Sequence, residues 1–146
     1  MNLTLLTFLT MAVVTDFQET RISNRLIVSG LIWGLAFRIM GEGSAGVVHF
    51  LVNISIPVIL LFLLFQMRAL GAGDIKLFSV AGGFLMTRDL FYLMVTAFFA
   101  GAVIGAGKLV YQRVHTGMWV WRRTQIHFSL AIIIGYFCVV WRGAIE

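Results

Sequence analysis

The chain has 146 residues, of which 60% are hydrophobic and only 12% are charged, and its net charge is +5. Soluble domains are nearer half apolar and a quarter charged, so this composition indicates an integral membrane protein of one domain. The basic residues are scattered between apolar runs rather than gathered in a stripe, which argues against nucleic acid as a partner.

Six apolar runs follow one another along the chain, at about 2–18, 25–40, 46–66, 70–87, 90–111 and 125–142. Several approach the roughly 20 residues that a helix needs to cross a bilayer, and the second and last are shorter. The runs lack the alternation that is typical of a membrane β-barrel. We therefore predict an all-α fold, a polytopic membrane protein of about six transmembrane helices in contact with membrane lipid.

The basic residues also predict how these helices are oriented. Eight of them follow the first, third and fifth runs, and three lie on the opposite side. Because basic residues are enriched in cytoplasmic loops, the larger group is expected in the cytoplasm and both termini outside it. The larger group is Arg21, Arg25, Arg68, Lys76, Lys108, Arg113, Arg122 and Arg123; the smaller is Arg38, Arg88 and Arg142.

One acid, Asp74, lies in the segment GAGDIKL at 71–77, at the edge of the fourth run. A carboxylate at membrane depth is costly, which makes it a functional candidate. In the ordinary interpretation, the glycines form a turn and Asp74 caps the next helix. In the functional interpretation, Gly71 and Gly73 let an extended substrate backbone approach the carboxylate. We expect Lys76 to be a topology anchor rather than a catalytic group.

A second acid, Asp16, closes the first run and precedes a polar loop in which Asn24 is expected to cap the second helix. If the flanking helices end near Arg21 and begin near Arg68, each acid lies roughly 9 Å inside its helix, at 1.5 Å per residue. The two acids are then expected to meet beneath the cytoplasmic surface. Two carboxylates that share one proton suggest an aspartyl hydrolase.

Together, the two segments resemble those of the type IV prepilin peptidases, which are membrane aspartyl proteases with a glycine-x-glycine-aspartate motif. Asp16 and Asn24 match the first family pattern, together with Ile22, and Ser23 replaces its usual proline. The segment 71–77 matches the second pattern throughout. His127 stands where relatives have proline before the last helix. In size, the chain is most similar to the small peptidases of tight-adherence (Flp) pilus systems.

The resemblance implies a single transmembrane peptidase domain over 1–146, with no methyltransferase or cysteine-rich domain. It implies that the expected substrate is a prepilin or pseudopilin precursor, cut at the cytoplasmic face of a prokaryotic inner membrane. No metal and no cofactor are expected, since the dyad itself would activate water. The site residues implied are Asp16 and Asp74 as catalytic acids, with support from Gly71, Gly73, Lys76 and Asn24.

Two other classes of function compete with this one. Intramembrane acids also serve proton-coupled transporters and channel subunits, but here both acids lie at one face and no further acid continues a path across. A third alternative is a catalytically silent pilus-assembly protein that uses the stripe of Ala97, Gly101 and Gly105 as its working surface. That stripe predicts close helix packing, within one chain or between two, and the oligomeric state is left open.

Overall fold

The computed structural model describes residues 2–19, 23–67, 70–116 and 128–144, with side chains for all of these except 2, 17–19, 112–113 and 115–116. All of the regular structure in these ranges is helical, which confirms the all-α prediction, and each helix corresponds to one predicted apolar run. The helices are α1 (Asn2–Glu19), α2 (Asn24–Glu42), α3 (Ser44–Gln66), α4 (Ala72–Phe84), α5 (Thr87–Thr116) and α6 (Phe128–Gly143).

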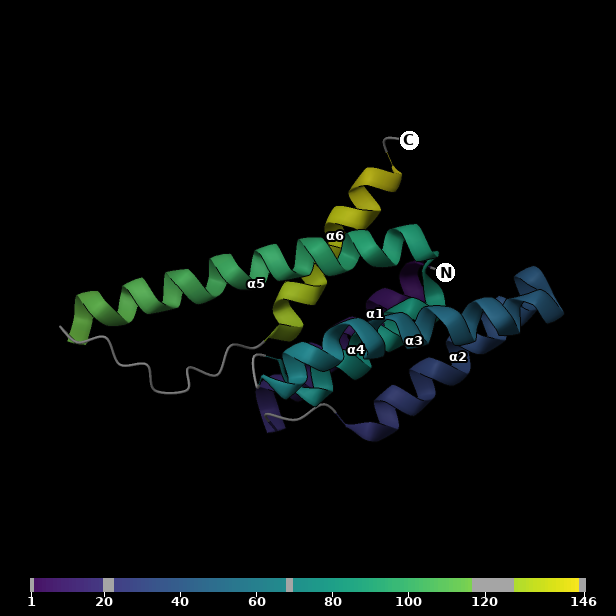
Figure 1. Ribbon diagram of the computed structural model, residues 1–146, viewed down its shortest axis with the longest axis horizontal. Helices are drawn as coiled ribbons and strands as arrows, with labels where there is room; N and C mark the ends of the chain where they lie inside the picture. Colours follow the sequence, from purple (N-terminus) through teal and green to yellow (C-terminus); the bar gives the residue numbers. More distant parts are fainter. Residues whose placement is uncertain (1, 20–22, 68–69, 117–127, 145–146) are drawn as a thin grey trace.

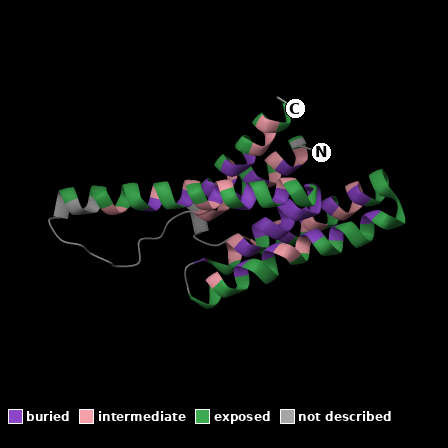
Figure 2. Cartoon of the chain, turned by 45° about the horizontal axis from the view of Figure 1, so that its top comes forward, coloured by how far each residue is buried: buried purple, intermediate pink, exposed green. Residues whose placement is uncertain are grey.

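Helix α4 is the central element, since it packs against each of the other five helices. From Ile75 to Phe84 its residues are buried, except Lys76 (Figure 2). Helices α2 and α3 form a hairpin through the single residue Gly43, whose φ of 62° suits glycine. Helix α6 crosses α5, the far end of which projects beyond the remaining helices (Figure 1). The two predicted site segments, which carry Asp16 and Asp74, therefore belong to a helix bundle with α4 at its centre.

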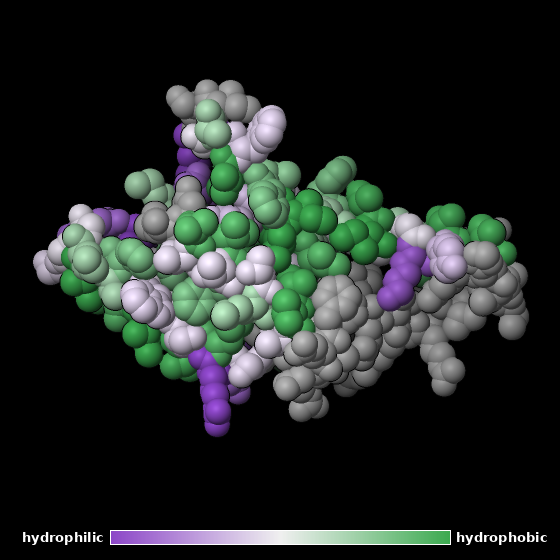
Figure 3. All heavy atoms as spheres, turned by 180° about the vertical axis from the view of Figure 1, so that it is seen from behind, coloured by the Kyte–Doolittle hydropathy of each residue, from purple (hydrophilic) through white to green (hydrophobic). Residues whose placement is uncertain are grey.

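The outer surfaces of this bundle are apolar. On α3, Ile59 and Leu63 are 72% and 68% exposed, and on α5 Phe99 is 74% exposed. Figure 3 shows apolar side chains over much of one face. Soluble monomers rarely expose such large apolar areas, so these faces fit lipid contact. Within the described residues, Ser44–Gln66 and Thr87–Tyr111 are long and apolar enough to span a bilayer, whereas α1 and α6 are apolar but shorter.

Helices α3 and α4 approach closely beside Pro57, which lies inside α3 as predicted. Proline has no N–H, so it cannot donate to the carbonyl of Asn53 one turn earlier. At this level a Cβ atom on Gly82 of α4 would lie 2.4 Å from that carbonyl oxygen. The Asn53 side chain also donates to the carbonyl of Leu85 (3.0 Å) and accepts from the hydroxyl of Thr87 (2.7 Å). These contacts fix the carboxyl end of α4 against α3.

Arg38, which the sequence placed among the outer basic residues, is buried against the same end of α4. Its Nε donates to the carbonyl of Gly83 (3.4 Å), and its guanidinium also binds the carbonyl of Leu85 and the carboxylate of Glu42. A helix leaves its last carbonyls unpaired, and here Arg38 supplies donors for two of them. Hydrogen bonds from His49 and then from Arg38 hold the pKa of Glu42 below its ordinary value, so Glu42 remains a charged partner.

We expect Arg38→Met to lower the thermal unfolding midpoint of the detergent-solubilised protein by several degrees. The substitution keeps much of the apolar stem but removes hydrogen bonds from a charged donor, each of which contributes about 1.5–3 kcal/mol. Circular dichroism during heating measures the midpoint. Arg88→Met is the control, because Arg88 is exposed. Equal midpoints for the two variants would show that the buried guanidinium does not hold α4.

The stripe of small residues on α5 packs against α6 of the same chain. A Cβ atom on Gly101 would lie 2.5 Å from the ring of Phe128, and a Cβ atom on Gly135 would lie 2.9 Å from the backbone nitrogen of Ala97. Gly105, which belongs to the same stripe on α5 as Ala97 and Gly101, is buried as well. Of the two packing arrangements that the sequence left open, the structure has the one within a chain. The stripe is therefore covered and does not offer a working surface to a partner.

Candidate active site

Asp74 lies in the first turn of α4. Gly71 is extended (φ −78°, ψ 148°) and precedes the helix, which begins at Ala72 and not near Arg68 as expected. Asp74 is thus the third residue of the helix, and its Oδ2 accepts a hydrogen bond from the N–H of Gly71 at 3.3 Å. This carboxylate pairs a backbone donor that the helix leaves free. The capping residue is Gly71 and not Asp74, which contributes to the cap from inside the helix. The depth inferred for Asp74 from a helix beginning near Arg68 was too great.

The two motif glycines stand in different surroundings. A Cβ atom on Gly71 would lie 3.0 Å from Oδ2 of Asp74, which is closer than ordinary van der Waals contact. Gly71 therefore keeps space open for the carboxylate. Gly73 is half-buried and is the second residue of α4. Its backbone is helical without a positive φ, so no turn requires glycine at this position.

Asp16 lies in the last turn of α1, three residues before the helix ends at Glu19. Its carboxylate Oδ2 accepts a hydrogen bond from the hydroxyl of Ser129 at 2.6 Å. Ser129 is fully buried in the first turn of α6. Helix α1 packs against both α4 and α6, so Asp16 stands where three helices come together.

The structure brings Asp16 and Asp74 together. Both side chains are half-buried, and they lie near enough for the charge of Asp16 to influence the carboxyl group of Asp74. Each acid lies within one turn of a helix end, Asp16 at the carboxyl end of α1 and Asp74 at the amino end of α4. Like charges that interact disfavour double ionisation, which is the condition for two carboxyl groups to share one proton.

Asn24 and Lys76 contact each other rather than either acid. The ammonium of Lys76 donates to Oδ1 of Asn24 at 2.9 Å, which joins α4 to α2. Asn24 does not cap α2, because the helix begins at Asn24 itself and Ser23 occupies the capping position without a side-chain cap. Residues two positions apart in an α-helix lie about 200° apart around its axis, so Lys76 points away from Asp74. This placement suits the anchoring role expected for Lys76.

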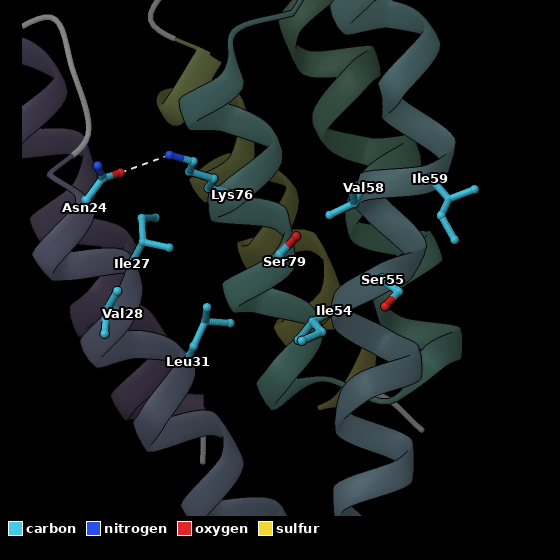
Figure 4. A pocket seen from close by; sticks show the side chains of 10 residues that line it. All are labelled: Asn24, Ile27, Val28, Leu31, Ile54, Ser55, Val58, Ile59, Lys76 and Ser79. Carbon is cyan, nitrogen blue, oxygen red and sulfur yellow. Dashed lines mark hydrogen bonds between the residues drawn. The ribbon is translucent and has the colours of Figure 1, made fainter.

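Lys76 and Asn24 stand at one end of an apolar groove between α2 and α3, with α4 as its floor (Figure 4). The groove has a volume of about 690 Å³, and Figure 4 shows aliphatic side chains along both walls. Ser79, on the same side of α4 as Lys76, also faces it. Helix α4 therefore has two different faces: one lines the groove, and the other carries the carboxylate of Asp74.

Ser23, the replacement for the usual proline, has φ −61° and ψ 128°. This φ lies in the range that a proline ring imposes, so the substitution preserves the local backbone. Ile22 and His127 lie outside the described residues, as does the side chain of Glu19. In the described part of the chain, no three His, Cys, Asp or Glu side chains are grouped so that they could hold a metal ion.

The sequence model of the type IV leader peptidase family matches residues 3–106, a range that contains both Asp16 and Asp74. The chain belongs to the type IV leader peptidase family. This leader peptidase is accordingly an all-α membrane protein of a protease family, as the sequence predicted. Helix α6, with Ser129, lies beyond the matched range. No curated protein and no solved structure matches the chain.

Sequence reasoning missed the contact of Ser129 with Asp16. Ser129 lies two residues after His127, where the resemblance concerned only the missing proline. Its partner is 113 residues away in the sequence, so no local spacing indicates the contact. A small polar residue in the first turn of an otherwise apolar helix was the one available signal.

Proposed function

We propose that this leader peptidase hydrolyses its substrate with Asp16 and Asp74 as a catalytic dyad. The observation that carries the proposal is that the two motif segments place two half-buried carboxyl groups near enough for their charges to interact. Among relatives of this family, leader cleavage is the activity that the name describes. A dyad supplies what peptide hydrolysis needs, one group to remove a proton from water and one to polarise the carbonyl.

In this mechanism, the ionised carboxylate takes a proton from water as the water oxygen attacks the scissile carbonyl carbon. The neutral carboxylic acid donates its proton to the developing oxyanion. The tetrahedral intermediate then collapses. The carboxyl group that took the proton from water gives it to the peptide nitrogen, which leaves as an amine, while a hydroxyl of the intermediate returns its proton to the other carboxylate. Both acids end the cycle sharing one proton, and water is the only co-reactant.

The proposed substrate is a prepilin or pseudopilin precursor with a short basic leader, a glycine before the scissile bond and an apolar helix after it. The apolar helix would lie in the bilayer and present the leader at the cytoplasmic face. The distribution of basic residues supports the same side for the dyad. We further propose cleavage without methylation of the new amino terminus, by a single peptidase domain of the Flp-pilus type.

Co-expression with a candidate Flp prepilin in a host without its own prepilin peptidase tests this function. The expected result is loss of the leader, seen as a mobility shift and verified by the mass of the mature amino terminus. That amino terminus is expected to be unmethylated. A precursor that keeps its leader beside a well-accumulated wild-type chain would contradict the proposed activity, and a methylated product would contradict the single-activity assignment.

The proposed orientation makes a separate prediction for cysteine labelling. Gly41, near the end of α2, is exposed with open space around it, so a cysteine there is accessible. In intact cells, Gly41→Cys should react with an impermeant thiol reagent, whereas a cysteine beside Arg122 should react only after the membrane is opened. Cys138 is first replaced by Ser in both variants. The reverse pattern would invert the protein and move the dyad away from the cytoplasm.

A further inference from the structure

The hydroxyl of Ser129 on α6 donates a hydrogen bond to the carboxylate of Asp16 on α1. The donor–acceptor distance of 2.6 Å is short for a hydroxyl and is typical of a bond to a charged oxygen. Ser129 has no solvent exposure. It lies outside the range matched by the family, so the family match does not account for the contact.

The position of Ser129 is fixed by the residue that precedes it. The ring of Phe128 packs against the rings of Phe78 on α4 and Phe98 on α5, with centroid distances of 6.1 and 5.4 Å. Gly101 leaves room for this ring, since a Cβ atom there would lie 2.5 Å from it. The first turn of α6 is thereby seated on both neighbouring helices. A hydroxyl mounted on this turn has little freedom to leave Asp16.

The helix ends around Asp16 explain why a donor is needed there. The carboxyl end of a helix carries partial negative charge, so the last turn of α1 disfavours an anion on Asp16. The amino end of a helix carries partial positive charge, and Ser129 lies in the first turn of α6. Helix α6 therefore offsets the unfavourable position of Asp16 with both its dipole and a hydroxyl.

We propose that Ser129 is a positioning residue for the dyad, resting on the function proposed above. Its hydroxyl binds Oδ2 of Asp16 and holds the carboxylate in one orientation relative to Asp74. A dyad without this contact binds the precursor as before but reaches the reacting geometry in a smaller fraction of complexes. The role therefore affects kcat and not KM.

The test compares purified variants in detergent with a prepilin substrate. Ser129→Ala should lower kcat by about 10- to 100-fold, the range expected for the loss of a hydrogen bond to a charged group, with KM changed less than about twofold. Ser129→Thr, which keeps the hydroxyl, should retain most of the activity. Ser129→Cys keeps the volume with a much weaker donor and should resemble the alanine variant.

Ser79→Ala is the matched control. Ser79 is also a buried serine, but it lies on α4 and its hydroxyl donates to the carbonyl of Ile75 in its own helix at 3.1 Å. This variant should keep kcat within about threefold of wild type. Full activity of Ser129→Ala, or equal losses in Ser129→Ala and Ser129→Thr, would overturn the role of the hydroxyl while leaving the peptidase function intact. An inactive wild type would instead remove the proposed function itself.

Discussion

Asp16→Asn and Asp74→Asn should each abolish leader cleavage while the protein still inserts and accumulates in the membrane. An amide has the shape of a carboxyl group, but it can neither accept the proton of water nor carry the shared proton. General acid–base catalysis by a positioned group contributes about 10²- to 10⁴-fold, so each loss should be at least of this order. The measurement is the fraction of mature pilin formed when each variant is co-expressed with its precursor.

Asp89→Asn provides a matched control for both variants. Asp89 is also a half-buried aspartate in a helix, but it lies in the first turn of α5, whereas the dyad joins the carboxyl end of α1 and the amino end of α4. The Asp89→Asn variant should process the precursor at close to the wild-type rate. Near-normal cleavage by either Asp16→Asn or Asp74→Asn would remove that residue from the dyad, and loss in all three variants would point to a defect shared by any charge removal.

Gly73→Ala should slow cleavage by about a hundredfold without lowering the amount of protein. Gly73 is helical in the first turn of α4, where alanine is favoured over glycine by up to about 1 kcal/mol. Helix propensity therefore gives no reason for a loss. If glycine admits the substrate backbone to Asp74, a methyl group displaces the reacting atoms, and a displacement of about 1 Å costs about this much rate.

Cleavage rates and membrane levels of Gly73→Ala are compared with those of Gly107→Ala. Gly107 lies in α5 with open space around it, so its methyl group meets nothing and the same change in helix propensity is made away from the dyad. Gly107→Ala should cleave normally. Equal activity of the two variants would leave Gly73 with a structural role only and would contradict the access that the glycine is proposed to give.

The helices could be predicted from the sequence because apolar runs are a local property. Each predicted run corresponds to one helix. The run predicted at 46–66, for example, agrees closely with α3, which spans Ser44–Gln66. The start of α4 was less predictable. Apolar residues precede it, but the extended backbone at Gly71 and the reach of Asp74 back to the Gly71 N–H decide where the helix begins. These are interactions between neighbours that hydropathy does not describe.

The motifs located both acids, but not the long-range contacts that join the helices. Arg38 was read as an outer basic residue because charge alone decides topology, whereas its partners Gly83 and Leu85 are 45 and 47 residues away. Ser129 reaches Asp16 across an even longer separation. Asn24 was expected to cap its own helix, and instead it binds Lys76 on α4. Such contacts depend on how helices pack, which one sequence does not specify.

The most direct test of the central claim is the product mass obtained with the purified wild-type chain alone. Incubation with a full-length Flp prepilin in detergent should yield two fragments, a leader and a mature pilin, whose masses sum to the precursor plus one water. The same preparation of Asp16→Asn should leave the precursor intact. An intact precursor with folded wild-type protein, or equal cleavage by both preparations, would contradict the account of this chain as an aspartyl leader peptidase.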